Sequence, residues 1–180
     1  MVLNLIVSTI AFFATSYFAK RWADENDLPK GMTRGAAIFA VALAVAESSA
    51  GGLINAALVA VPGASAYYLG GCIVYTEASR TGLLSISKDE MRGMRSASEP
   101  YAQLAARRVR EKLGATWGLS ETGASGPTGN RYGDAAGHAC FAVSGPVEKV
   151  ITLETRSADR DANMRAFAQH ALELLEASLR

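Results

Sequence analysis

The stretch Ala46-Glu47-Ser48-Ser49-Ala50-Gly51-Gly52-Leu53 separates an apolar run from a segment with helical periodicity. Residues 36–46, which precede Glu47, carry no charge, as is typical of a strand that helices cover on both faces. Apolar residues then recur at helical spacing until Pro62-Gly63. We therefore predict a strand, a tight turn and a helix whose free N–H groups face an anion or oxyanion beside Ser48. The alternative is that Ser48 only caps the helix.

Charge is scarce in this chain of 180 residues, of which 49% are apolar and 19% are charged. The apolar content excludes a disordered chain, because such chains lack the surface that offsets ordering entropy. The formal net charge of +1 provides no long-range field for nucleic acid, so any anion must be held by a local site. We expect no nucleic-acid partner. The length allows one domain with an appendage.

Residues 1–19 contain no Asp, Glu, Lys, Arg or His. A helix of that length reaches roughly 28 Å, close to the hydrocarbon thickness of a bilayer of about 30 Å. We predict an apolar N-terminal helix that can anchor the chain to the inner or plasma membrane. Lys20 and Arg21 would then place the following domain in the cytoplasm. The alternative is a buried first helix of a soluble domain.

A linker with charges of both signs completes the segment 1–34, and we assign residues 35–180 to one domain. In this domain strands alternate with helices, which predicts a three-layer α/β fold. The strands are expected at Tyr67–Tyr75, Trp117–Ser120, His138–Val143 and Val147–Thr155, and the helices at Glu99–Leu113, Asp161–Leu179 and after a capping box at Ser87–Glu90.

Two further motifs accompany the Ser48 stretch. Val61-Pro62-Gly63-Ala64-Ser65-Ala66-Tyr67-Tyr68-Leu69-Gly70-Gly71 is followed by Val74-Tyr75, and later comes the loop Thr122-Gly123-Ala124-Ser125-Gly126-Pro127. In order and spacing, residues 36–180 resemble the C-terminal domain of the CinA family, the nicotinamide-nucleotide amidases. The resemblance implies a three-layer α/β/α domain with a mixed sheet of about six strands. It also implies a homo-oligomer.

The activity that the resemblance implies is hydrolysis of nicotinamide mononucleotide to the nicotinate nucleotide and ammonia, with no cofactor. The family's serine nucleophile corresponds to Ser48. Its base is a lysine five residues after a tyrosine, and counting from Tyr75 leads to Arg80. A guanidinium stays protonated and cannot replace this base. We expect Arg80 either to bind a phosphate or carboxylate, or to favour the phenolate of Tyr75 by its charge, in which case Tyr75 would be the substitute base. The alternative is an inactive nucleotide-binding or structural protein, such as a membrane-anchored subunit of a larger complex.

The remaining candidate residues are assigned to substrate binding. Glycines in the first turn let a ligand approach the backbone, and the third motif, if it is more than a plain turn, closes over the substrate. A buried glutamate in the first motif needs a partner and is expected to brace the turn. An arginine after the third motif either reaches a phosphate or is a solvated loop charge. These residues are Glu47, Gly51, Gly52, Thr122, Gly123, Ser125, Arg131 and Arg160.

Several other patterns have simpler explanations. Ser85 and Lys88 match the spacing of penicillin-recognising enzymes, but Ser87 with Glu90 is better explained as a helix cap. The histidines have no carboxylate or cysteine pattern around them, so we predict no metal site. A basic run at residues 107–112 is expected to be a solvated helix face. The two cysteines are expected to be reduced core thiols.

Overall fold

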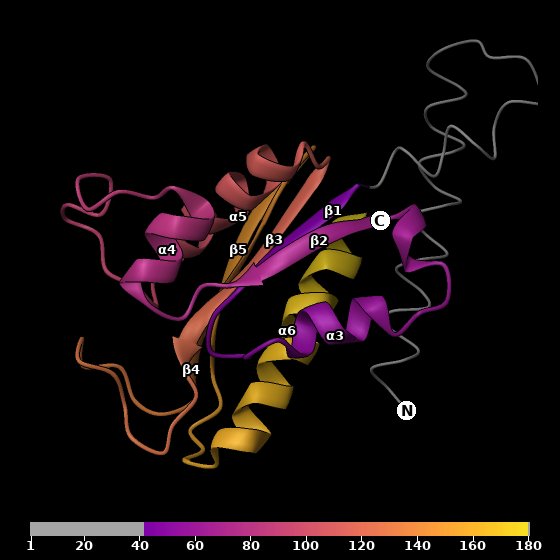
Figure 1. The fold of residues 1–180 in the computed structure, drawn as a ribbon. Coiled ribbons are helices and arrows are strands. Elements are labelled where there is room, and N and C mark those ends of the chain that lie inside the picture. The colour runs from indigo at the N-terminus through magenta and orange to yellow at the C-terminus, as the bar shows by residue number, and fades with distance from the viewer. Residues whose placement is uncertain (1–41, 180) are drawn as a thin grey trace, which may run out of the picture.

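The structure, a computed structural model, describes residues 42–179 and places a five-stranded sheet between two layers of helices (Figure 1). This arrangement confirms the predicted α/β class. The elements in chain order are β1 (Leu43–Glu47), α3 (Leu53–Val59), a 3-10 turn (Ala64–Ala66), β2 (Tyr68–Ile73), α4 (Glu77–Leu84), α5 (Glu99–Leu113), β3 (Trp117–Ala124), β4 (His138–Ser144), β5 (Glu148–Glu154) and α6 (Arg160–Leu179).

The strands lie in the order β2-β1-β3-β4-β5. β1 is parallel to both β2 and β3, whereas β4 and β5 run antiparallel to their neighbours. The sheet is therefore mixed, as expected, but it has five strands within residues 42–179 rather than about six.

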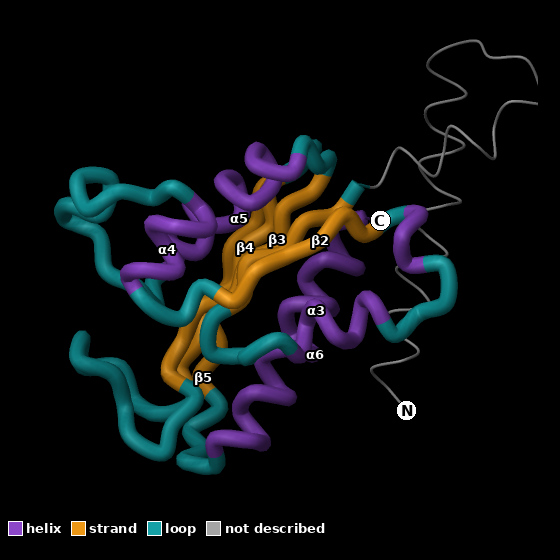
Figure 2. The backbone as a smooth tube through the Cα atoms, viewed as in Figure 1, coloured by secondary structure: helices purple, strands orange, loops and turns teal. Residues whose placement is uncertain are grey.

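Two crossovers connect the three parallel strands on opposite faces of the sheet. The first runs from β1 through α3 on one face to β2. The second runs from β2 through α4 and α5 on the other face to β3, which lies on the opposite side of β1 (Figures 1 and 2). The carboxyl ends of β1, β2 and β3 meet where these crossovers diverge. In open α/β sheets this switch point is the usual position of a ligand crevice.

Residues 43–46 of β1 are uncharged because both faces of the strand are buried. Leu43 and Val45 pack into one core with residues of α3 and α6, and Ala44 and Ala46 pack into a second core with residues of α5. The α5 side uses small residues, and at Gly118 of β3 an added Cβ would lie 2.0 Å from the carbonyl oxygen of Ala106. α5 therefore rests almost directly on the sheet.

The helix predicted after Ser87 is absent from the described part of the chain, so this prediction was wrong. The Ser87 N–H donates to the Glu90 carboxylate at 2.9 Å, and the Glu90 N–H donates to the Ser87 hydroxyl at 3.2 Å. Only turns follow, because these side chains can bond nearby backbone without a helix. The helix that sequence analysis missed is α4, whose capping box is formed by Thr76 and Ser79.

The third strand is longer than predicted. β3 continues to Ala124 and pairs Thr122 with Cys140 and Gly123 with Ala139 of β4. Thr122 and Gly123 thus belong to the strand rather than to the glycine-rich loop. They are fixed by the sheet at the same end as Ser48.

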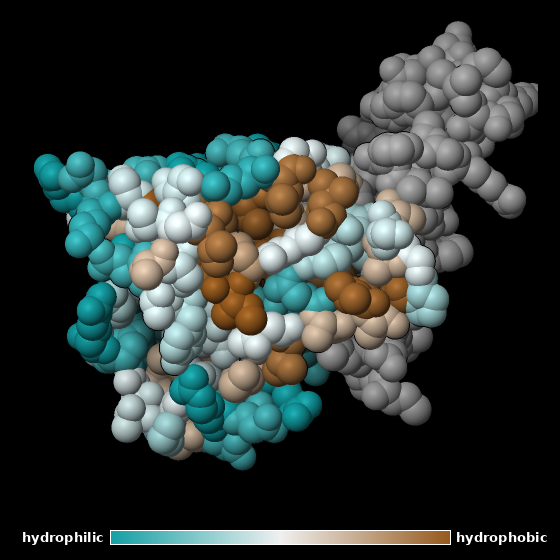
Figure 3. Space-filling model, viewed as in Figure 1, coloured by the Kyte–Doolittle hydropathy of each residue, from teal (hydrophilic) through white to brown (hydrophobic). Residues whose placement is uncertain are grey.

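The predicted membrane anchor at residues 1–19 lies outside the described residues. Within residues 42–179 no helix has the length and apolar character needed to cross a bilayer. The edge strand β2 exposes Leu69 and Ile73, and Figure 3 shows apolar side chains gathered on this face. Such an edge can contact another chain, and the expected homo-oligomer stays a prediction.

The close approach of α5 to the sheet can be tested with Gly118→Ala. The new methyl group would collide with backbone, so we expect a loss of about 1–3 kcal/mol in the free energy of unfolding, measured by urea denaturation. Gly82→Ala is the matched control, because Gly82 lies in α4 with open space around it. The control should gain roughly 0.5–1 kcal/mol from helix propensity. Equal effects of the two substitutions would contradict this packing.

Candidate functional site

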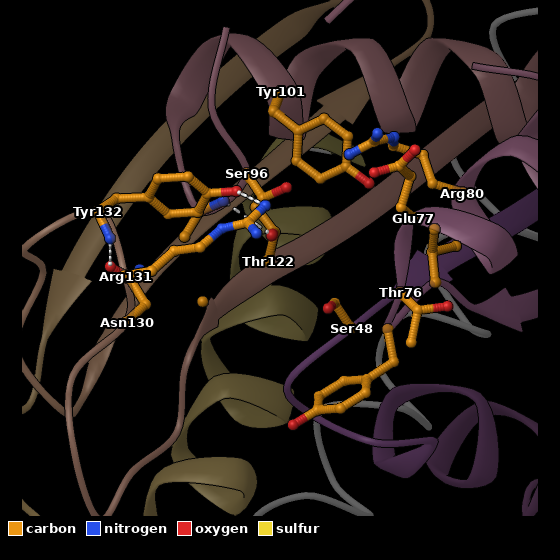
Figure 4. A pocket seen from close by; sticks show the side chains of 14 residues that line it. Ser48, Thr76, Glu77, Arg80, Ser96, Tyr101, Thr122, Asn130, Arg131 and Tyr132 are labelled. Carbon is orange, nitrogen blue, oxygen red and sulfur yellow. Dashed lines mark hydrogen bonds between the residues drawn. The ribbon is translucent and has the colours of Figure 1, made fainter. Parts of the chain in front are cut away.

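A cavity of about 400 Å³ opens at the carboxyl ends of the three parallel strands (Figure 4). Its walls come from the turn after β1, the β2–α4 connection, the start of α5, the end of β3 and the loop before β4. The lining residues are Ser48, Val74, Tyr75, Thr76, Glu77, Arg80, Ser96, Ala97, Tyr101, Thr122, Gly123, Asn130, Arg131 and Tyr132.

The turn that carries Ser48 is held by Glu121 of β3. The backbone N–H groups of Ser48 and Ala50 each donate to one carboxylate oxygen of Glu121 at 2.9 Å, and the Ser49 hydroxyl donates to the other. The Ser48 hydroxyl itself makes no hydrogen bond with any residue from 42 to 179, and it faces the cavity (Figure 4). This polar group is therefore available to a ligand.

Glu121 is only 2% exposed, and sequence analysis missed it. Burial raises the pKa of its carboxyl group, while the hydrogen bonds from Ser49, Ala50 and Ser48 act in the opposite direction. The residue lies 73 positions from Ser48 in the sequence. A carboxylate within an otherwise uncharged strand was the one signal that could have found it.

Glu47 holds the first residues of α3 rather than the turn that carries Ser48. Its carboxylate accepts the N–H groups of Ile54 and Asn55 at 3.2 and 3.0 Å, together with the Asn55 side-chain amide. It is fully buried and does not line the cavity. The N–H groups of α3 therefore bind the protein's own carboxylate, which corrects the expectation that they face a ligand.

Gly51 and Gly52 allow the backbone conformation of the turn, since both have a positive φ. Gly52, with φ 103°, is the N-cap of α3, so Ser48 does not have that role. Gly51, with φ 68°, packs against α6, where an added Cβ would lie 2.7 Å from Met164 Cε. Neither glycine lines the cavity.

Arg80 projects from α4 into the cavity and is only 8% exposed. Its Nε is buried without a hydrogen-bond partner, and its guanidinium forms no salt bridge with residues 42–179. Figure 4 shows the guanidinium beside the ring of Tyr101. Burying an unpaired charge is costly, and a planar guanidinium suits a carboxylate or phosphate. Arg80 is therefore a candidate anchor for an anionic ligand group.

Tyr75 lines the cavity but is 60% exposed, and its hydroxyl accepts a hydrogen bond from Arg160 at 3.1 Å and forms none with Ser48. Arg160 lies outside the lining and also donates to the Gly126 carbonyl at 2.6 Å. Arg160 thus connects Tyr75 to the loop that follows β3. The role of Tyr75 as a base stays a prediction.

The opposite wall contains Thr122, Arg131 and Tyr132. The Thr122 hydroxyl accepts the N–H of Ala97 at 3.2 Å, and the Arg131 guanidinium lies 5.0 Å from the Tyr132 ring centre while donating to its hydroxyl. Ser125, by contrast, is buried outside the cavity. Arg131 is thus a second cation at the cavity wall.

Tyr101 presents its hydroxyl to the cavity close to Arg80 (Figure 4). Burial raises its pKa to about 12, so the hydroxyl stays protonated at neutral pH and can donate a hydrogen bond. The helical periodicity of α5 hid this residue from sequence analysis, because aromatic residues at such spacing usually belong to a core.

His138 contacts the cavity wall through Ala97, which lines the cavity. Its Nδ1 bonds the Glu154 carboxylate, and its Nε2 lies 3.0 Å from the carbonyl oxygen of Ala97. Both partners are acceptors, so this geometry requires a doubly protonated ring. Burial lowers the pKa of His138, but the bonds to Glu154 and Ala97 and the charge of Asp134 raise it above its ordinary value overall.

The other patterns stay outside the site. Lys88 is 81% exposed and pairs with Glu77 at 3.0 Å, and Ser85 ends α4. Arg107 and Arg108 form salt bridges with Glu148 and Glu90 on the surface. In the described residues no group of histidine, cysteine or carboxylate side chains could hold a metal ion, and both cysteines are free thiols.

The sequence model of the CinA C-terminal domain matches residues 32–179. This chain belongs to the CinA C-terminal domain family. It is 37% identical over 156 residues to a CinA-like protein of Gloeobacter violaceus, covering 85% of this chain and 36% of that protein. A CinA-like protein of Myxococcus xanthus is 38% identical over 138 residues, with 76% and 33% covered. The chain thus spans about a third of the length of these curated relatives.

Solved structures share the fold of this CinA domain. A CinA superfamily protein from Enterobacter cloacae superposes with a TM-score of 0.80 at 21% identity, covering 99% of this chain and 92% of that one. One from Escherichia coli gives a TM-score of 0.71 at 26% identity, with 76% and 80% covered. The fold and the family are confirmed. The nicotinamide-nucleotide amidase activity stays a prediction.

The support of the Ser48 turn in the CinA domain can be tested at Glu121. Glu121→Ala leaves the N–H groups of Ser48 and Ala50 without an acceptor, so the free energy of unfolding should fall by about 2 kcal/mol or more in urea denaturation. Glu121→Gln is the matched control, because its amide oxygen can accept the same N–H groups and its amide nitrogen can donate to Ser49. If both variants lose stability equally, Glu121 does not act through these bonds.

The state of His138 predicts a pH dependence. Because its pKa is raised in the folded domain, its contribution to stability is fully present below its unfolded pKa of about 6.5 and is lost as pH rises through the folded pKa. The difference in unfolding free energy between the wild type and His138→Gln should therefore shrink from pH 5.5 to pH 8.5. His170→Gln provides the comparison, because the partly buried His170 ring stacks on Phe141 and bonds a backbone carbonyl of its own helix rather than a carboxylate. A difference that grows with pH would contradict a charged His138.

Proposed function

We propose that this CinA domain binds a pyridine nucleotide in the cavity, where Arg80 holds an anionic group of the ligand. The observation that carries the proposal is the buried guanidinium of Arg80, which lies in the same cavity as Ser48 and forms no hydrogen bond or salt bridge with residues 42–179. A ligand anion would supply the missing charge and hydrogen bonds.

Other features of the cavity favour the same class of ligand. Its volume of about 400 Å³ falls within the usual range for small-molecule sites. The rings of Tyr101 and Tyr132 offer apolar surface for a heterocyclic base. Arg131 provides a second cation for a ligand that carries a phosphate.

Hydrolysis of a linear amide is the second candidate function, favoured by the Ser48 hydroxyl, which lines the cavity and forms no hydrogen bond with residues 42–179. In this reaction Ser48 Oγ would attack the amide carbon of nicotinamide mononucleotide, ammonia would leave, and water would release the nicotinate nucleotide. The attacking hydroxyl must lose a proton to a base, and a guanidinium at position 80 cannot accept one. Tyr75 remains the proposed substitute base.

Binding without turnover is the alternative role. Arg80 in place of a lysine base favours it, since the charge needed for recognition is kept while the proton acceptor is lost. A homo-oligomer, or a subunit of a larger complex anchored through residues 1–19, belongs to the same proposal. Detergent dependence of the full chain would support the anchor.

Nucleotide binding is tested by calorimetric titration with nicotinamide mononucleotide and nicotinate mononucleotide. We expect the wild type to bind at least one of them, and the double variant Arg80→Gln with Arg131→Gln to lose at least tenfold in affinity for it because both cations are gone. Arg92→Gln is the matched control, since Arg92 is exposed and pairs with Asp89. No binding by the wild type would refute the proposal.

Catalysis is tested by assaying ammonia from nicotinamide mononucleotide. If the domain is a hydrolase, the wild type releases ammonia and Ser48→Ala does not, although it still binds nucleotide. If only the base is missing, Arg80→Lys gains activity. Ammonia release that is unchanged in Ser48→Ala would exclude Ser48 as the nucleophile.

A further inference from the structure

The Arg80 end of the cavity offers hydrogen-bond donors to a ligand. A guanidinium has five N–H donors and no acceptor, and that of Arg80 is buried with its Nε unpartnered. The hydroxyl groups of Ser48 and Tyr101 make no hydrogen bond with residues 42–179. The Arg80 guanidinium and the Tyr101 hydroxyl therefore lie side by side with unused donors, and Ser48 lies farther along the same cavity (Figure 4).

A set of donors discriminates between two groups of nearly equal shape. A carboxylate accepts hydrogen bonds at both oxygens, and it can take two parallel bonds from one guanidinium. A carboxamide accepts at one oxygen only, and its NH₂ group would face the donors of Arg80. A donor left without its partner in a buried site weakens binding.

We propose that this domain binds the acid form of the pyridine nucleotide in preference to the amide, with the ring carboxylate held by Arg80. This inference rests on the proposed function, namely that the cavity is a pyridine-nucleotide site. Tyr101, which lies beside the guanidinium, donates to the same carboxylate. The arginine at position 80 thus selects the deamidated nucleotide.

The nucleotide's phosphate lies at the other end of the cavity. Figure 4 shows the Arg80 guanidinium beside Tyr101 and, on the other side of the view, the Arg131 guanidinium beside Thr122 and Tyr132. Two separated cations match a ligand with two separated anionic groups. Arg131 comes from a loop and is more exposed than Arg80, which suits a doubly charged, strongly hydrated phosphate.

Glu77 is the one carboxylate among the lining residues, and it could accept a bond from a carboxamide. Its Oε1 already forms a salt bridge with Lys88 at 3.0 Å, and half of its side-chain surface is open to solvent. It forms no salt bridge with Arg80 within the described chain. Because water screens an exposed carboxylate, Glu77 does not cancel the charge of the buried guanidinium.

The experiment is a calorimetric titration of the full chain with nicotinate mononucleotide and nicotinamide mononucleotide, which differ only in the carboxylate and the carboxamide. We expect the acid to bind at least tenfold more tightly, about 1.4 kcal/mol. Ammonia is assayed in the same samples, so that any conversion of amide to acid is corrected for.

Four variants test whether the preference for the acid nucleotide depends on Arg80. Arg80→Gln should abolish it, and Arg80→Lys should reduce it because an ammonium group cannot form the two parallel bonds. Arg131→Gln should lower the affinity for both nucleotides by the same factor, since both carry the phosphate. Arg92→Gln, with a surface arginine removed, should change neither affinity. Melting temperatures of all variants establish that they fold.

The outcomes separate this inference from the function on which it rests. Equal affinities, or tighter binding of the amide, would overturn the acid preference while leaving the nucleotide site intact. A preference that survives in a folded Arg80→Gln variant would also overturn it, because the discriminating group would lie elsewhere. Binding of neither nucleotide would overturn the proposed function itself.

Discussion

The site depends on one buried carboxylate. Glu121 of β3 accepts the N–H groups of Ser48 and Ala50 and the hydroxyl of Ser49, and so fixes the turn after β1 to the neighbouring strand. Each of these groups would be costly to bury unpaired. The bonds connect two parallel strands at their carboxyl ends, where the crossovers diverge. The position of the Ser48 hydroxyl is therefore set by the sheet rather than by its own loop.

A second buried carboxylate determines what the turn offers a ligand. Glu47 accepts the first free N–H groups of α3, so the positive end of that helix is neutralised within the protein. In the proposed nucleotide site, anion recognition consequently depends on the side chain of Arg80, which enters the cavity from the other helical layer. The cavity thus combines a polar turn from one crossover with a guanidinium from the next.

Local patterns predicted those elements whose burial is indicated by an uncharged run or by apolar periodicity. The uncharged run that ends at Glu47 predicted a strand covered on both faces, and the periodicity of 99–113 predicted α5. The helix expected after Ser87 was wrong, because its capping bonds form equally well in an isolated turn. α4 was missed, since it has eight residues and a weak apolar pattern. Among the site residues, Ser48 and Arg80 were found through motifs. Glu121 was marked only by its charge within an otherwise uncharged strand, and Tyr101 has no local signature.

By itself, the sequence determined the α/β class, the family and the presence of an arginine where a lysine base is expected. These properties reside in apolar periodicity and in short motifs, which are local along the chain. Only the tertiary structure decided which carboxylate holds the Ser48 turn and which groups share the cavity with Arg80. Those contacts join residues up to 73 positions apart, and their partners are chosen by strand order and by the cost of burying polar groups unpaired.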